Sequence, residues 1–322
     1  MHNYSRLLSI GAISIAAATL LSACGGSGGG GSGTAAPGAT TVSGTVAKGI
    51  VKGGRVLVCR IVNGAPEPDA SCAATATGND GSFSVTMSDG FAGPVMIKVM
   101  AGSGSMMSDE TTGADIPYAM TMRAVVPSMS GTMAAYVTPF SEMAASAVGT
   151  SGIDAGKMTQ AMSTVQTMMA NFGIDLNVKP MMDLKNDGAN SVMLGKEANM
   201  VKQLARVMMA AKNSSALTDA NGTPCNTAGT VAQQVACAIN AMNSVMTGPG
   251  TFDATKSATV LGALNSQTVT TVMMPIMRAD GSIVMETADM TSSASIQTAM
   301  QDAGMMTATA TTVMPGMMQG MH

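Results

Sequence analysis

Arg55-Val56-Leu57-Val58-Cys59-Arg60-Ile61-Val62 is the stretch that decides the fold, because it is rich in β-branched residues and ends at the turn-forming pair Asn63-Gly64. Similar short runs lie on either side of it, and turns such as Asn79-Asp80-Gly81 and Asp89-Gly90 bound them. These runs are Val42–Val46, Ser82–Met87 and Pro94–Met100. The pattern predicts a small antiparallel β-sandwich over residues 42–127.

A family resemblance supports this prediction. The opening Val42-Ser43-Gly44-Thr45-Val46-Ala47-Lys48-Gly49, the strand Arg55–Val58 and the turn and strand Gly78–Val85 resemble the carboxypeptidase regulatory-like, or prealbumin-like, β-sandwich of many exported proteins. The resemblance covers the β region alone. It implies a structural or adhesive module that has no active site of its own.

Downstream of Val137-Thr138-Pro139-Phe140 the apolar residues recur at steps of three and four, which predicts helices rather than strands. Three such series run from Met158 to Phe172, from Met193 to Ala211 and from Val231 to Met246, the last stopping at Gly248-Pro249. The sequence therefore predicts a multidomain α+β chain. In this chain a mostly α-helical, methionine-rich domain over residues 128–250 follows the sandwich.

The rest of the C-terminal part is predicted as a mixed segment over residues 251–304 and a tail over residues 305–322. In the mixed segment, Asp280-Gly281 is typical of a hairpin turn between two strands, and a helix is expected from Ser292 to Ala303. The tail has threonine, alanine, proline and glycine between its methionines. We expect it to be disordered.

The N-terminus has the pattern of an export signal over residues 1–23, with one positive charge at Arg6 before the apolar stretch Leu7–Leu21. Leu21-Ser22-Ala23-Cys24 resembles the lipobox of bacterial lipoproteins, whose cysteine receives lipid, palmitate included, after cleavage. The next residue, Gly25, is not the Asp that favours retention at the inner membrane in that family. The resemblance implies an outer-membrane lipoprotein, periplasmic or surface-exposed, whose membrane anchor is the lipid on Cys24. Residues 24–41, rich in glycine and serine, predict a flexible tether.

Four cysteines remain besides Cys24, and they form two closely spaced pairs in regions of different texture. Because disulfides persist in exported proteins, we predict the bonds Cys59–Cys72 and Cys225–Cys237. The second bond would clamp the start of the third predicted helix. Zinc binding is the competing interpretation, although neither pair has the C-x-x-C spacing of common zinc sites.

Methionine is the anomaly of the composition: it occurs 35 times among 322 residues, and after the initiator it is absent before Met87. Replacing leucine by methionine conserves core volume at small cost, so helical spacing makes most of these residues core candidates. Core packing does not explain the Met-Met doublets or the methionines of the tail. Tryptophan is absent, and His322 is the one histidine left once His2 is removed with the signal.

This composition resembles that of the methionine-rich periplasmic proteins that scavenge reactive chlorine and oxygen species. The resemblance implies a renewable oxidant sink for oxidative stress, because methionine sulfoxide reductase, the expected partner, returns the sulfoxide to methionine. The candidate redox-active residues are Met305, Met306, Met314, Met317, Met318 and Met321.

Two other functions stay open. Soft thioethers bind Cu(I), and the tail offers a candidate metal site. Its ligands would be Met314, Met317, Met318, Met321 and His322. Alternatively, the chain is a structural or adhesive surface lipoprotein in which methionine enrichment is incidental. Apart from Cu(I), no cofactor is expected.

Enzymatic activity and nucleic-acid binding are both disfavoured. With His322 as the single mature histidine, a Ser-His-Asp triad is excluded. The adjacent carboxylates Asp109 and Glu110 lie on a predicted loop, where their side chains point apart and form no acid–base pair. The net charge of −3 is mild and scattered, so the sequence has no basic footprint for phosphate backbones.

Overall fold

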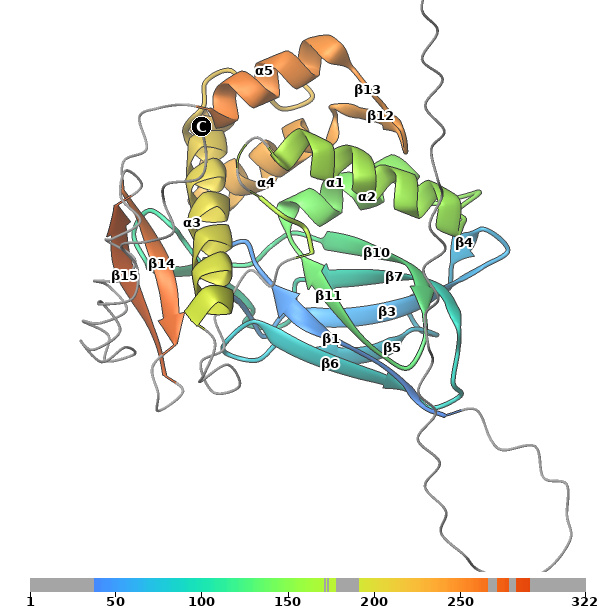
Figure 1. The fold of residues 1–322 in the computed structure, drawn as a ribbon. Helices are drawn as coiled ribbons and strands as arrows, with labels where there is room; N and C mark the ends of the chain where they lie inside the picture. The colour runs from blue at the N-terminus through green and yellow to red at the C-terminus, as the bar shows by residue number, and fades with distance from the viewer. Residues whose placement is uncertain are drawn as a thin grey trace, which may run out of the picture. The chain divides into compact units, whose positions relative to one another are not determined.

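The computed structural model describes residues 38–170, 172, 174–177, 191–265, 271–277 and 282–289. They combine strands and helices and confirm the predicted α+β class (Figure 1). The strands are β1 Thr40–Val46, β2 Val51–Lys52, β3 Arg55–Val62, β4 Ala65–Pro66, β5 Ala73–Ala76, β6 Ser82–Met87, β7 Gly93–Met100, β8 Met106–Ser108, β9 Asp115–Pro117, β10 Met122–Met129, β11 Thr132–Val137, β12 Met246–Gly248, β13 Thr251–Phe252, β14 Thr271–Met277 and β15 Ile283–Asp289. The helices are α1 Pro139–Val148, α2 Ala155–Ala170, α3 Ser191–Asn213, α4 Val231–Asn243, α5 Ala254–Leu264 and the 3-10 turn η1 Cys225–Thr227.

All four strand runs expected from the sequence are confirmed as β1, β3, β6 and β7. They belong to two sheets, one ordered β11-β1-β6 and the other β10-β7-β3-β4 with β5 also paired to β3. Buried side chains of both sheets, such as Val42 and Val85 from one and Val56 and Val99 from the other, belong to one apolar core. At the turn between β3 and β4, Asn63 and Gly64 both have positive φ, 52° and 76°, as a two-residue hairpin requires.

The strand-rich part extends to Val137, past the boundary predicted after Pro127. One pairing is also not antiparallel, because β1 and β11 run parallel, with Gly44 opposite Ala135. A Cβ at Gly44 would lie 1.6 Å from the carbonyl oxygen of Ala135, so this close pairing needs glycine. The parallel pairing has no local signal, since the two strands are far apart in the sequence.

The change from strand to helix takes place at Thr138, as the sequence indicates. Thr138 caps α1 by accepting a hydrogen bond from the Ser141 amide, and Pro139 occupies the first turn. Helices α1 and α2 pack on β10 (Figure 1). Glu142 of α1 is 4 % exposed and forms an ion pair with Arg123 of β10. Both of its carboxylate oxygens accept hydrogen bonds from the Arg123 guanidinium, at 2.6–3.2 Å. Sheet and helices therefore share one compact unit, with Met143 and Met158 buried in its core.

The later helices agree with the sequence in part. Helices α2, α3 and α4 match the three predicted series, but α4 ends at Asn243, before Gly248-Pro249, and the chain then forms β12. Helix α5, capped by Asp253, was not expected. The predicted hairpin is confirmed as β14 and β15, and it packs beside α3 through β14 (Figure 1).

Several predicted regions lie outside the described residues. These are the signal segment 1–23, Cys24 and most of the tether, the helix Ser292–Ala303 and the tail 305–322. Among the helices that the structure does describe, none is both long and apolar enough to cross a bilayer.

Candidate functional site: disulfides, methionine thioethers and an apolar cavity

The first predicted disulfide is present between Cys59 of β3 and Cys72, which precedes β5, with Cα atoms 4.5 Å apart. The antiparallel register of β3 and β5 pairs Val58 with Ala73, and one further step sets Cys59 opposite Cys72. The bond therefore joins two directly facing residues. Cys59 is fully buried, whereas Cys72 lies at the end of a loop with exposed residues.

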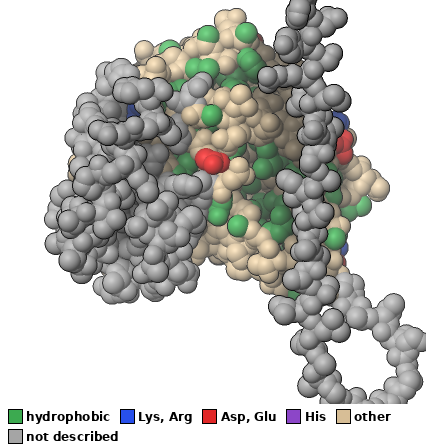
Figure 2. Space-filling view, viewed as in Figure 1, with side chains coloured by type: hydrophobic (Ala, Val, Ile, Leu, Met, Phe, Trp, Pro, Cys, Tyr) green, Lys and Arg blue, Asp and Glu red, His purple; other side chains and the backbone are tan. Residues whose placement is uncertain are grey.

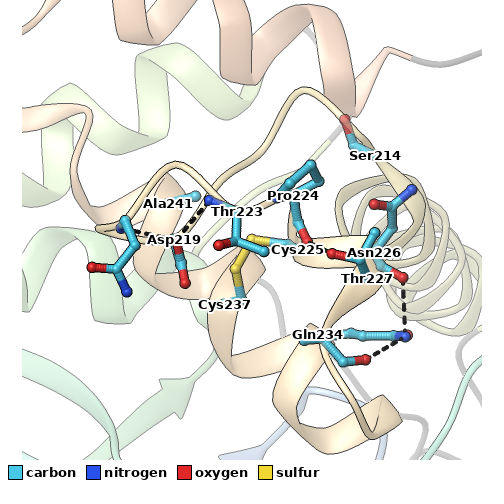
Figure 3. Close-up of a disulfide and its surroundings, with 12 residues drawn as sticks. Ser214, Asp219, Thr223, Pro224, Cys225, Asn226, Thr227, Gln234, Cys237 and Ala241 are labelled. Carbon is cyan, nitrogen blue, oxygen red and sulfur yellow. Dashed lines mark hydrogen bonds between the residues drawn. A yellow bond between two sulfur atoms is a disulfide. The ribbon is translucent and has the colours of Figure 1, made fainter.

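The second predicted disulfide joins Cys225 of η1 to Cys237 of α4, with Cα atoms 5.4 Å apart (Figure 3). As expected, it clamps the segment that leads into α4. Gln234 of α4 strengthens the clamp by donating from Nε2 to the carbonyl oxygens of Asn226 and Ala228. Structural disulfides, and not a zinc site, are thus the arrangement that these four cysteines adopt.

The turn before this disulfide is held by Asp219, whose carboxylate accepts hydrogen bonds from the amides of Thr223 and Asn221 at 2.8 Å (Figure 3). The bond from Thr223 is the main cause of a pKa below the ordinary value at Asp219, because it stabilises the charged form. Thr223 and Pro224 then lead directly into Cys225. The polar turn and the disulfide thus lie next to each other in one cross-linked segment.

The methionines with described side chains are mainly core residues. None of them is fully exposed, and fourteen are buried. The buried ones are Met87, Met96, Met107, Met122, Met129, Met143, Met158, Met168, Met169, Met200, Met208, Met209, Met242 and Met246. In this part of the chain methionine fills core positions that leucine usually takes, in the helices as the spacing predicts and also in strands β6, β7, β8, β10 and β12.

Seven described methionines are partly exposed. They are Met100, Met106, Met120, Met133, Met162, Met273 and Met285. Two of these have thioethers that accept hydrogen bonds: the sulfur of Met133 from the Ser130 amide at 3.4 Å, and that of Met273 from the Thr287 hydroxyl at 3.3 Å. These are the described methionines whose side chains are partly open to solvent.

An apolar cavity of about 280 Å³ lies between β10, β11, α1 and α2. Residues 124–127 and 133–136 line it from the two strands, and Met162 and Leu176 line it from the helical side. The described residues around it carry no charge. In the view of Figure 2, few charged side chains are visible on the described surface, and green apolar ones appear near its middle. The cavity gives Met133 and Met162 a shared apolar surrounding.

Two buried ion pairs involve the adjacent carboxylates Asp109 and Glu110. Glu110 pairs with Lys48 at 2.5 Å, and Asp109 pairs with Lys212 of α3 at 3.0 Å. The two carboxylates thus have different partners. The lysines were not predicted as site residues, because an isolated lysine in a sequence usually indicates a solvated surface.

Burial acts to raise the pKa of Asp109, but the hydrogen bond and charge of Lys212, together with Thr112 and the charge of Lys48, outweigh it, so the pKa lies below its ordinary value. A hydrogen bond from Thr112 acts in the same direction. Asp109 is therefore a stable buried anion. It holds the loop between β8 and β9 to α3, and the amide of Met273 donates to the Glu110 carbonyl to fasten β14 there as well.

Among the described residues, one group of three acidic, histidine or cysteine side chains has the spacing of metal ligands: Cys59, Asp69 and Cys72, with donor atoms within 4.8 Å of one another. The two sulfurs are bonded to each other, and Asp69 pairs with Lys98 at 2.6 Å. The candidate lipidation residue Cys24, the candidate redox methionines of residues 305–321 and the candidate copper ligand His322 lie outside the described residues.

Comparison of the chain with protein-family models, with curated proteins and with solved structures gave no match.

Proposed function

We propose that the chain is a non-enzymatic envelope lipoprotein held on the outer membrane by lipid on Cys24. The support is local sequence: an apolar stretch that ends in Leu21-Ser22-Ala23-Cys24, followed by a glycine- and serine-rich tether. Cys24→Ser tests it. Labelled palmitate should be incorporated into the wild-type chain and not into this variant, and the variant should leave the membrane fraction. Equal labelling of the two chains contradicts the proposal.

At the end of this anchor we propose a methionine-based oxidant sink with two classes of methionine. The observation that carries it is the division of the described methionines into fourteen buried and seven partly exposed ones. Buried thioethers build the core and react slowly, because an oxidant has no access to them. Partly exposed thioethers such as Met133 and Met162 react while the core stays packed. The methionines of residues 305–321 are proposed to belong to the reactive class.

The proposed cycle of methionine oxidation and repair needs no cofactor bound to this protein. Hypochlorous acid transfers its oxygen to the thioether, which becomes a sulfoxide, and chloride and a proton leave. A methionine sulfoxide reductase then removes the oxygen as water while two of its thiols become a disulfide. The protein returns to its starting state, so each accessible sulfur is used repeatedly.

The experiment is a titration of the full chain with hypochlorite, followed by treatment with the reductase. We expect several equivalents to be consumed with no loss of near-ultraviolet circular dichroism, and the reductase should restore the original mass. Met133→Leu should lower the consumption by about one equivalent, whereas the matched core variant Met143→Leu should leave it unchanged. Irreversible aggregation, or equal effects of the two variants, contradicts the sink.

A second candidate is a structural or adhesive lipoprotein, and the burial of the fourteen core methionines favours it, since core methionines need no reactive role. Two disulfides in one compact unit fit the same function. This candidate predicts no reversible oxidation and a surface partner recovered by crosslinking. Copper binding by Met314, Met317, Met318, Met321 and His322 predicts instead that a chain ending at Gly304 loses Cu(I) affinity.

A further inference from the structure

Three sulfur-bearing residues lie side by side on three neighbouring strands. The register of β3 and β7 sets Cys59 opposite Met96, and the register of β3 and β5, continued by one residue, sets Cys59 opposite Cys72. Directly opposite residues on paired strands project from the same face of a sheet, with Cβ atoms about 4.5–5.5 Å apart. The side chains of Cys72, Cys59 and Met96 therefore project from one face of the sheet, in a row across three neighbouring strands.

Two residues of the row, Cys59 and Met96, are buried, and the third, Cys72, is half-buried beside an exposed loop. Cys59 is 0 % and Met96 1 % exposed, so water is kept from two of the three sulfurs. Cys72 is half-buried and follows Ala70 and Ser71, which are both exposed, so the proposed route of a small reagent to the disulfide is from this loop.

We propose that reduction of the Cys59–Cys72 disulfide opens a Cu(I) site, formed by the two thiolates and the thioether of Met96. In the reduction, a dithiol supplies two electrons and two protons. The S–S bond breaks, Cys59 and Cys72 become thiols, and the dithiol becomes a disulfide. Binding of Cu(I) then displaces the two thiol protons. The site exists in the reduced chain and is closed in the oxidised one.

The donor set selects Cu(I) rather than Zn²⁺. Cu(I) prefers thiolate and thioether ligands, and three sulfurs satisfy it. Structural zinc takes four ligands in a tetrahedron, usually thiolate and imidazole. The described neighbour that could extend the set is Asp69, a hard oxygen ligand already paired with Lys98 at 2.6 Å. A thioether is also a poor zinc ligand, so Met96 contributes to copper binding alone.

The other disulfide is an internal control. Among the described residues, Cys225 and Cys237 belong to no group with a third acidic, histidine or cysteine donor, unlike Cys59 and Cys72. Variants of the second pair therefore serve as the comparison for variants of the first. This proposal does not depend on the oxidant sink, because it uses a buried methionine that the sink leaves unreacted.

The test is anaerobic titration of the full chain with Cu(I) against a coloured Cu(I) chelator, before and after reduction by a phosphine. Copper held by other methionines is common to both forms, and the difference between them measures the site. We expect one additional ion in the reduced chain, loss of that ion in Cys59→Ser/Cys72→Ser and its retention in Cys225→Ser/Cys237→Ser. Far-ultraviolet circular dichroism confirms that each variant is folded.

Met96→Leu identifies the third ligand, because the change conserves core volume. We expect about tenfold weaker binding, with the copper X-ray absorption signal changing from three sulfurs to two, whereas Met122→Leu, an equally buried control, binds as the wild type does. The proposal is overturned if reduction adds no copper, if Cys59→Ser/Cys72→Ser retains the extra ion, or if Met96→Leu leaves affinity and sulfur number unchanged.

Discussion

Removing the ammonium group of Lys212 should strongly destabilise the fold, because Asp109 would remain as a buried charge. Lys212 is 5 % and Asp109 2 % exposed, and their atoms lie 3.0 Å apart. Breaking a buried pair at one partner costs about 3–5 kcal/mol. The amide and hydroxyl of Thr112 still donate to Asp109, at 3.2 and 3.0 Å, and they keep the cost of Lys212→Met near the lower end of that range.

The double variant Asp109→Asn/Lys212→Met separates two effects: loss of the attraction between Lys212 and Asp109, and burial of an unpaired Asp109 carboxylate. With both charges removed and the Thr112 bonds still available to an amide, we expect a cost of about 1 kcal/mol, well below that of Lys212→Met. Urea unfolding with an unchanged m value is the assay. Lys52→Met is the control, because the Lys52–Asp115 pair is 29 % and 40 % exposed and should contribute less than about 1 kcal/mol. If Lys212→Met costs no more than Lys52→Met, the reasoning is refuted.

Further predictions concern pH and two glycines. Because the folded pKa of Asp109 lies below its unfolded value, its contribution to stability should be complete above the unfolded pKa and lost as the pH falls through the folded pKa; urea midpoints measured at a series of acidic pH values should fall less in Asp109→Asn. Gly44→Ala should destabilise the β1–β11 pairing by several kcal/mol, since the new Cβ meets the Ala135 carbonyl, and a wild-type melting temperature would contradict the parallel pairing. Gly262→Ala, in α5 with open space around it, should stabilise the fold by about 0.5–1 kcal/mol. Thermal melting measures the change, and a lower melting temperature would contradict the prediction.

Local signals explain which parts of the fold were predictable. The run Arg55–Val62 and the pair Asn63-Gly64 specify a strand and its turn through a few neighbouring residues, and the structure has both. Periodic apolar residues likewise predicted α2, α3 and α4, and close spacing predicted both disulfides. Helix α5 was missed because its two threonines and one serine resemble the residues of the surrounding loops.

Long-range features were not predictable from one sequence. The parallel pairing of β1 with β11 joins segments far apart in the chain, and neither segment identifies its partner. In the sequence, the neighbours of Lys48 and Lys212 are typical of surface lysines. Only the folded chain places Glu110 next to Lys48 and Asp109 next to Lys212. The row Cys72, Cys59 and Met96 has the same origin, since sheet register alone sets three separate residues side by side.

The most direct test of the oxidant sink is the order in which individual methionines of the native chain are oxidised. Peptide mass spectrometry after graded doses of hypochlorite measures this order for every described site. The account predicts that Met133, Met162 and the other partly exposed residues become sulfoxides before Met143, Met158 and the other buried ones, and that the reductase reverses the change. Oxidation of buried and partly exposed methionines at the same rate would contradict it.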